Sequence, residues 1–73
     1  MNNNSRNGIV VRYAVVLVDT DLRNGAMNQT DLQYFDECRD AELWIGAHGS
    51  QYGQNLENNI SRFFRVEKRF YIG

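Results

Sequence analysis

The sequence holds one cysteine, one histidine and no long apolar stretch. Cys38 alone cannot form an intrachain disulfide, and His48 alone offers no cluster of side chains for structural zinc. The longest apolar run includes Arg12 and is well short of the about 20 residues that a membrane span needs. No apolar segment begins before Ile9, so the polar start at residues 1–7 is not a signal peptide. We therefore expect a protein of the reducing cytoplasm, with no contact with a membrane.

The small size of the chain limits both its organisation and its chemistry. A chain of 73 residues forms one domain and buries only about 60% of its unfolded surface. We expect disorder over residues 1–7 and a single domain over residues 8–73. With no disulfide and no metal or other cofactor expected, association with another chain is the remaining support for so small a core. The net charge of −1 does not by itself favour nucleic acid as a partner.

The longest apolar run predicts a central β-strand over residues 8–19. Ile9, Val11 and the alternate residues after them are apolar, and so are Val10, Ala14 and the alternate residues on the other side. A strand that is apolar on both faces is normally covered on both, by its own chain or by a partner. This pattern predicts an architecture but no activity.

Turn and strand signals follow this run. The segment from Asp19 to Thr30 is polar and contains the strong turn dipeptide Asn24-Gly25, so it predicts a wide loop. Residues 32–35 alternate and predict a short second strand, antiparallel to the first.

A helix is predicted next, over residues 37–48, with Asp36 as its N-cap and Gly49 as its end. Residues 49–59 are polar and predict a loop, although apolar spacing leaves a short helix over residues 55–64 open. A last strand is predicted over residues 61–72. The fold class is therefore α+β, a three-stranded antiparallel sheet with one helix packed on it in the order ββαβ. One helix covers only one face, so the other face of the sheet calls for a partner chain.

Residue types that could support catalysis are few. Cys38 and His48 lie at opposite ends of the predicted helix, about 15 Å apart, too far for a nucleophile and its base. Asp19 and Asp21 share one side of an extended chain and could bind a metal, but the end of a strand in a polar loop explains them better. We therefore predict that the protein is not an enzyme.

The last strand carries the strongest candidates for a binding surface. It interleaves cations with aromatic rings, a pattern found both in protein interfaces and in sheet surfaces that bind RNA. The candidate residues on this strand are Arg62, Arg65, Arg69 and Tyr71. A second, acidic patch consists of Asp36, Glu37 and Asp40. On this basis the double exchange R65E/R69E is predicted to abolish binding without unfolding the domain.

Four short segments together resemble a group of known proteins. They are Tyr13–Asp19, Tyr34–Asp36, Asp40–Trp44 and Phe64–Val66. In pattern and order they are similar to small β–β–α–β proteins of phages and mobile elements, the anti-CRISPR proteins among them. The resemblance implies a stoichiometric inhibitor, acting in the host cytoplasm, that occludes a surface of a host defence complex made of protein or ribonucleoprotein. It assigns no role to any single residue.

Two other functions stay open on the sequence. The arginine-rich strand is compatible with a small nucleic-acid-binding module, whose affinity would fall steeply with salt. A homodimeric accessory protein would bury its exposed sheet against a second copy of itself.

Overall fold

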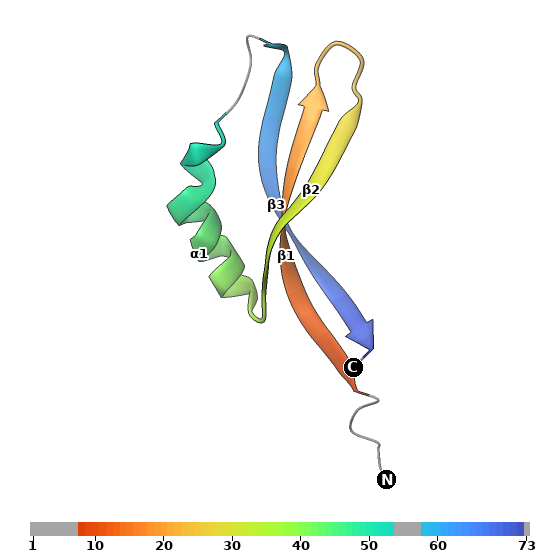
Figure 1. The fold of residues 1–73 in the computed structure, drawn as a ribbon, viewed down its shortest axis with the longest axis vertical. Coiled ribbons are helices and arrows are strands. Elements are labelled where there is room, and N and C mark those ends of the chain that lie inside the picture. The colour runs from red at the N-terminus through yellow and green to blue at the C-terminus, as the bar shows by residue number, and fades with distance from the viewer. Residues whose placement is uncertain (1–7, 54–57, 73) are drawn as a thin grey trace.

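The first strand lies in the middle of the sheet. The computed structural model describes residues 8–53 and 58–72. Its elements are β1 (Ile9–Asp21), β2 (Met27–Phe35), α1 (Cys38–His48), the 3-10 helix η2 (Gly49–Gln51) and β3 (Ile60–Ile72). The strands are antiparallel in the order β2-β1-β3, with α1 alongside them (Figure 1). The predicted ββαβ fold of the α+β class is thereby confirmed.

The two faces of β1 are covered in different ways. Val15 and Leu17 face α1 and lie in register with Val66 and Phe64 of β3, and we call this side the helix face. The other side, the open face, carries no helix from the described part of the chain. Three residues of β1 on the open face are nevertheless fully buried, namely Ala14, Val16 and Val18. The middle of this strand is thus covered within the single chain and needs no partner for its burial, whereas the sequence predicted that a partner chain would cover it.

The helix packs on the sheet through small side chains. Ala41 is the fully buried residue of α1 and contacts the helix face. At the other end of the helix, a Cβ atom added to Gly49 would lie 3.2 Å from the ring of Phe64. Gly49 ends α1 as predicted, but its φ of −59° is right-handed and the chain continues into η2. The glycine is therefore suited to a close approach of helix and sheet rather than to a left-handed turn.

The second strand is longer than the sequence predicts. It begins at Met27 instead of Leu32, and the predicted wide loop shrinks to residues 22–26. The Asn24-Gly25 turn is confirmed, with Gly25 at φ 77° and its N–H donating to the Asp21 carbonyl oxygen at 2.7 Å. The polar residues after this turn form a strand because they pair with β1. An edge strand tolerates polar residues, since much of its surface stays in water.

The start of the helix also differs from the prediction. The N-cap is Glu37, whose side chain makes no capping hydrogen bond. Asp36 instead accepts a hydrogen bond from Arg12 of β1 at 3.0 Å. The end of the chain agrees better, since β3 begins at Ile60 and excludes a helix over residues 60–64. The disorder predicted for residues 1–7 and the helix considered for residues 55–57 lie outside the described residues.

The sheet extends beyond the helix at one end. β2 pairs with β1 only from Tyr13 onward, whereas β3 pairs with β1 along its full length, up to Ile9 opposite Ile72. Residues 9–12 of β1 and residues 69–72 of β3 thus form a two-stranded segment that projects past α1 (Figure 1). We call this segment the ribbon end.

Candidate functional site

The predicted binding residues fall into three separate places. Arg65, Arg69 and Tyr71 lie on the open face, because they pair in register with open-face residues of β1. Arg62 lies on the helix face, opposite Asp19. The acidic residues Asp36, Glu37 and Asp40 lie at the start of α1. The structure therefore does not bring the predicted site together as one surface.

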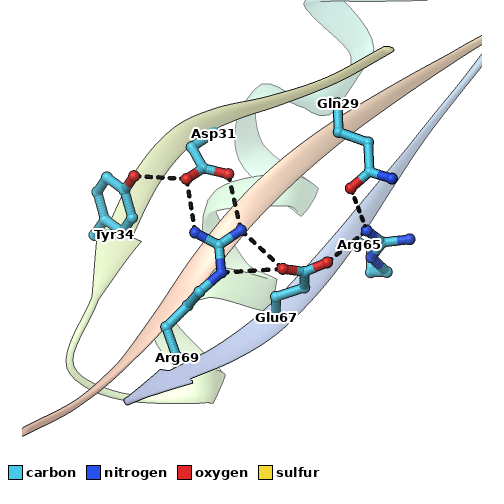
Figure 2. A network of polar contacts seen from close by, with 6 residues as sticks. All are labelled: Gln29, Asp31, Tyr34, Arg65, Glu67 and Arg69. Carbon is cyan, nitrogen blue, oxygen red and sulfur yellow. Dashed lines mark hydrogen bonds and ion pairs between the residues drawn. The ribbon is translucent and has the colours of Figure 1, made fainter. Parts of the chain in front are cut away.

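A network of polar side chains covers the open face of β1 (Figure 2). Arg69 from β3 crosses the central strand and donates two hydrogen bonds to Asp31 of β2, from Nη1 at 2.8 Å and from Nη2 at 3.0 Å. Its Nε and Nη2 also donate to Glu67, at 3.0 and 2.8 Å. Asp31 accepts a further hydrogen bond from the Tyr34 hydroxyl at 2.6 Å. Arg69 is thus held between two carboxylates.

Arg65 extends the same network along the sheet. Its Nη2 donates to Gln29 of β2 at 2.7 Å and also to Glu67 (Figure 2). We call the six residues the open-face network: Gln29, Asp31, Tyr34, Arg65, Glu67 and Arg69. Because every cation in it contacts a carboxylate of the same chain, Arg65 and Arg69 contribute to the fold and are not free cations awaiting a ligand.

The network forms because β1 has small side chains below it. On the central strand, Ala14 lies directly opposite Glu67 of β3, and Val16 lies directly opposite Arg65. Their short side chains let the long side chains of the edge strands meet above them. The aliphatic parts of those long side chains then shield the apolar strand from water.

A β-bulge places the key carboxylate. Val15 pairs with Gln33 but Val16 pairs with Asp31, so Leu32 is an extra residue in β2. Without the extra residue, strict alternation would turn Asp31 to the helix face. The bulge therefore brings Asp31 within reach of Arg69.

Hydrogen bonds from arginine shift the pKa values of both carboxyl groups in the network. The Arg69 guanidinium, with the Tyr34 hydroxyl, lowers the pKa of Asp31 from 3.8 to about 2. Arg69 and then Arg65 lower the pKa of Glu67 below its usual value. Hydrogen bonding to Asp31 raises the pKa of Tyr34, and hydrogen bonding to Asp31 and Glu67 raises that of Arg69. The hydrogen bonds from arginine thus favour the charged form of both carboxyl groups.

These shifts predict a loss of stability in acid. Asp31 and Glu67 bind protons less readily in the folded than in the unfolded chain, so their contribution is complete above about pH 5. It is lost as the pH falls from there towards 2. We expect the urea midpoint to decline across this range and D31N to decline less steeply from a lower starting value. A D31N variant with the wild-type stability and slope would contradict the role of Asp31.

Arg62 connects three elements on the helix face. Its Nε donates to Asp19 Oδ1 at 2.6 Å and its Nη2 to Asp19 Oδ2 at 3.2 Å. Its Nη1 donates to the backbone oxygen of Tyr52, just after η2, at 2.8 Å. The side chains of Arg62 and Asp19 are each 27% exposed, so the ion pair is largely shielded from water. Through these contacts, Arg62 joins the strands to the end of the helix.

The residues considered for catalysis have other contacts. Asp21 accepts hydrogen bonds from the Arg23 side chain at 2.9 and 3.0 Å, which lower its pKa, and Asp19 is bound by Arg62. Cys38 and His48 are the first and last residues of α1, and the His48 ring stacks on Trp44 at 4.7 Å. In residues 8–53 and 58–72, no group of three His, Cys, Asp or Glu side chains is placed to hold a metal ion.

The acidic patch lies beside the ribbon end. Asp36 pairs with Arg12, the last β1 residue before β2 begins to pair, and Glu37 pairs with Arg39 at 3.4 Å. Asp36 and Glu37 are largely exposed, with 79% and 64% of their side-chain surface in water. Asp40 is exposed in the first turn of α1. These carboxylates are therefore accessible to a partner that docks at this end of the sheet.

Comparison with protein families, with curated proteins and with solved structures finds no match to this chain. Its function must therefore be argued from its own residues. In the part of the chain that the structure describes, no helix has the length and apolarity that crossing a membrane requires.

Five exposed apolar residues lie together on the ribbon end. Ile9 is 67% exposed, Phe70 64% and Ile72 88%, and Val10 and Tyr71 are also exposed. Of these, the sequence prediction included only Tyr71. The other four were missed because their exposure depends on the unequal lengths of the strands. Four residue pairs of β1 and β3 extend past the point where β2 ends and the chain turns into the helix.

Proposed function

We propose that this chain is a non-enzymatic protein-binding module whose binding surface is the ribbon end. The observation that carries the proposal is the cluster of exposed apolar residues there, at the tip of two strands. Groups of exposed apolar side chains on small proteins mark sites of association. The carboxylates of the acidic patch border this surface and favour a partner with basic residues.

The backbone at the ribbon end suggests how the partner binds. Residues 9–12 of β1 have β3 on one side, but β2 ends its pairing at Tyr13. An extended segment of a partner could continue the line of β2 and pair with this free edge, as in other β-strand additions. Its apolar side chains would contact Ile9 and Phe70, and a basic residue would approach Asp36.

The resemblance to small phage proteins extends this proposal to a biological role. A module of this kind would act as an inhibitor in the host cytoplasm and occlude a surface of a host defence complex. Nucleic acid is the less favoured partner, because Arg65 and Arg69 already contact Asp31, Glu67 and Gln29.

A pull-down with three forms of the tagged chain tests the proposal. We expect the wild type to capture a defined protein from a bacterial lysate in the presence of nuclease. I9Q/V10Q should lose most of this capture, since it removes apolar surface from the ribbon end and leaves β3 unchanged. L22Q/L43Q is the matched control, because it removes two exposed apolar residues elsewhere, 55% and 64% exposed against 67% and 37% for Ile9 and Val10, and should bind as the wild type does.

Three outcomes distinguish the alternatives. Loss of capture by I9Q/V10Q alone supports the ribbon end as the binding surface. Equal capture by all three forms would place the partner elsewhere on the chain. Capture that disappears with nuclease would replace the proposal by nucleic-acid binding.

A further inference from the structure

The outer edge of β3 is a long and regular free edge. β3 spans 13 residues and pairs with β1 without a register shift. Among the described residues, no backbone hydrogen bond reaches β3 from any segment other than β1. The strand is therefore paired on one side only, along a length well above the usual five or six residues.

Three of the usual protections of a sheet edge are missing from β3. Edge strands are normally kept from pairing by shortness, proline, a bulge or charged side chains. Of these, β3 has charged side chains, Lys68 among them. β2, the other edge, is shorter and carries the bulge at Leu32, whereas β3 has neither a bulge nor a proline. An edge of this kind is suited to pairing with another strand.

The side chains of β3 are complementary to a second copy of β3. We propose that two copies pair antiparallel through this edge, with a two-fold axis between their Val66 residues, to form one six-stranded sheet. Residues at equal distances from Val66 then stand opposite each other. Each cation meets a carboxylate or an aromatic ring in the pairs Arg65–Glu67, Phe64–Lys68, Phe63–Arg69 and Arg62–Phe70. The outer pairs are Ser61–Tyr71 and Ile60–Ile72. Opposite charges and cation–aromatic contacts at directly opposed positions stabilise paired strands.

Neighbouring registers do not share this complementarity. A two-fold axis at Arg65 places two copies of that arginine side by side and sets Arg62 opposite Lys68. An axis at Glu67 opposes two glutamates and sets Arg65 against Arg69. Because like charges directly opposite each other are destabilising, the sequence of β3 favours the register centred on Val66, which is also the one that pairs all 13 residues.

One atom of the open-face network supports the same register. The Nε of Arg65 is buried and has no hydrogen-bond acceptor among the described residues. In the proposed dimer, Glu67 of the second copy stands directly opposite Arg65. Two arginines and two glutamates then alternate around the axis, which adds an acceptor beside each guanidinium.

Disulfide trapping tests the register directly. In a C38S background, S61C/Y71C places two thiols about 33 Å apart in one strand, too far for an intrachain disulfide. In the proposed dimer each thiol faces its counterpart, so mild oxidation should give a covalent dimer within minutes. F63C/Y71C is the register control, because its thiols face each other only with an axis at Glu67. Rapid cross-linking of the control, or of neither variant, would overturn the proposal.

A pair of charge variants tests the energetics at one exposed site. Phe63 is 46% exposed and faces Arg69 of the second copy. F63E should keep dimerisation within a few-fold of the wild type, whereas F63R should weaken it about tenfold or more, since it sets two like-charged pairs side by side. Analytical ultracentrifugation measures both, with circular dichroism to confirm equal folding. Equal dissociation constants, or a wild type that is monomeric at high micromolar concentration, would overturn the dimer. Either result leaves the ribbon-end proposal standing, because the partner there pairs with the free edge of β1, although both proposals place Phe70 in a contact.

Discussion

The double exchange R65E/R69E, predicted from the sequence to leave the domain folded, is expected from the structure to unfold it at neutral pH. Arg69 bridges Asp31 and Glu67, and Arg65 bonds the same Glu67. Replacing both arginines would gather four carboxylates over Ala14 and Val16, and the nearest cation, Arg12 opposite position 69, is already paired with Asp36. Burial of the central strand would then be opposed by mutual repulsion. We expect far-UV circular dichroism to show the loss of a cooperative urea transition.

Acid should reverse this loss. The clustered carboxyls of the variant would bind protons more readily when folded, so its stability should rise as the pH falls from 7 to about 4. The wild type should change in the opposite direction below about pH 5. R12A is the matched control, because Arg12 pairs with Asp36 at the exposed end of the sheet and its loss should leave the transition in place. A folded R65E/R69E at pH 7 would show that the network is not needed.

The exchange A41E is expected to cost about 3–5 kcal/mol of unfolding free energy, enough to unfold a domain of this size. Ala41 is the fully buried residue of α1, and its methyl group packs on the helix face of the sheet. A glutamate there would bury a charge with no partner. Chemical denaturation, monitored by the fluorescence of Trp44 on the same helix, measures the effect.

The control for this exchange lies on the same helix. Ala47 is exposed, so A47E adds the same side chain without burying it. Glutamate near the C-terminus of a helix opposes the helix dipole, at a cost of about 0.3–1 kcal/mol. Similar effects of A41E and A47E would mean that α1 contributes little to the stability of the sheet.

The parts of the fold that could be predicted were those with a strong local pattern. The run after Gly8 is apolar on both faces, and it became the central strand. The helix over residues 38–48 was one residue from its predicted start. The first half of β2 was missed because Asn28 and Thr30 favour turns by themselves. They form a strand because they pair with β1 across the turn at residues 22–26, which the propensities of the single residues do not report.

The candidate site was less predictable, because it depends on register. Alternation along β3 already separates Arg62 from Arg65 and Arg69, as the structure shows. Which carboxylates those arginines contact depends on the extra residue Leu32, and no local signal marks that bulge. The exposure of Phe70 follows from where β2 stops, which sequence periodicity does not report.

The order of the strands has a consequence for the synthesis of the protein. β1 is the first strand to leave the ribosome, but its long partner β3 is the last, and Ile9 meets Ile72 only when nearly the whole chain is available. Until then the most apolar segment can pair only with the polar β2, and one side of it stays open. Folding is therefore governed by closure of the longest loop in the chain, which is slow compared with local pairing. During that delay, the nascent β1 is the segment most in need of a chaperone.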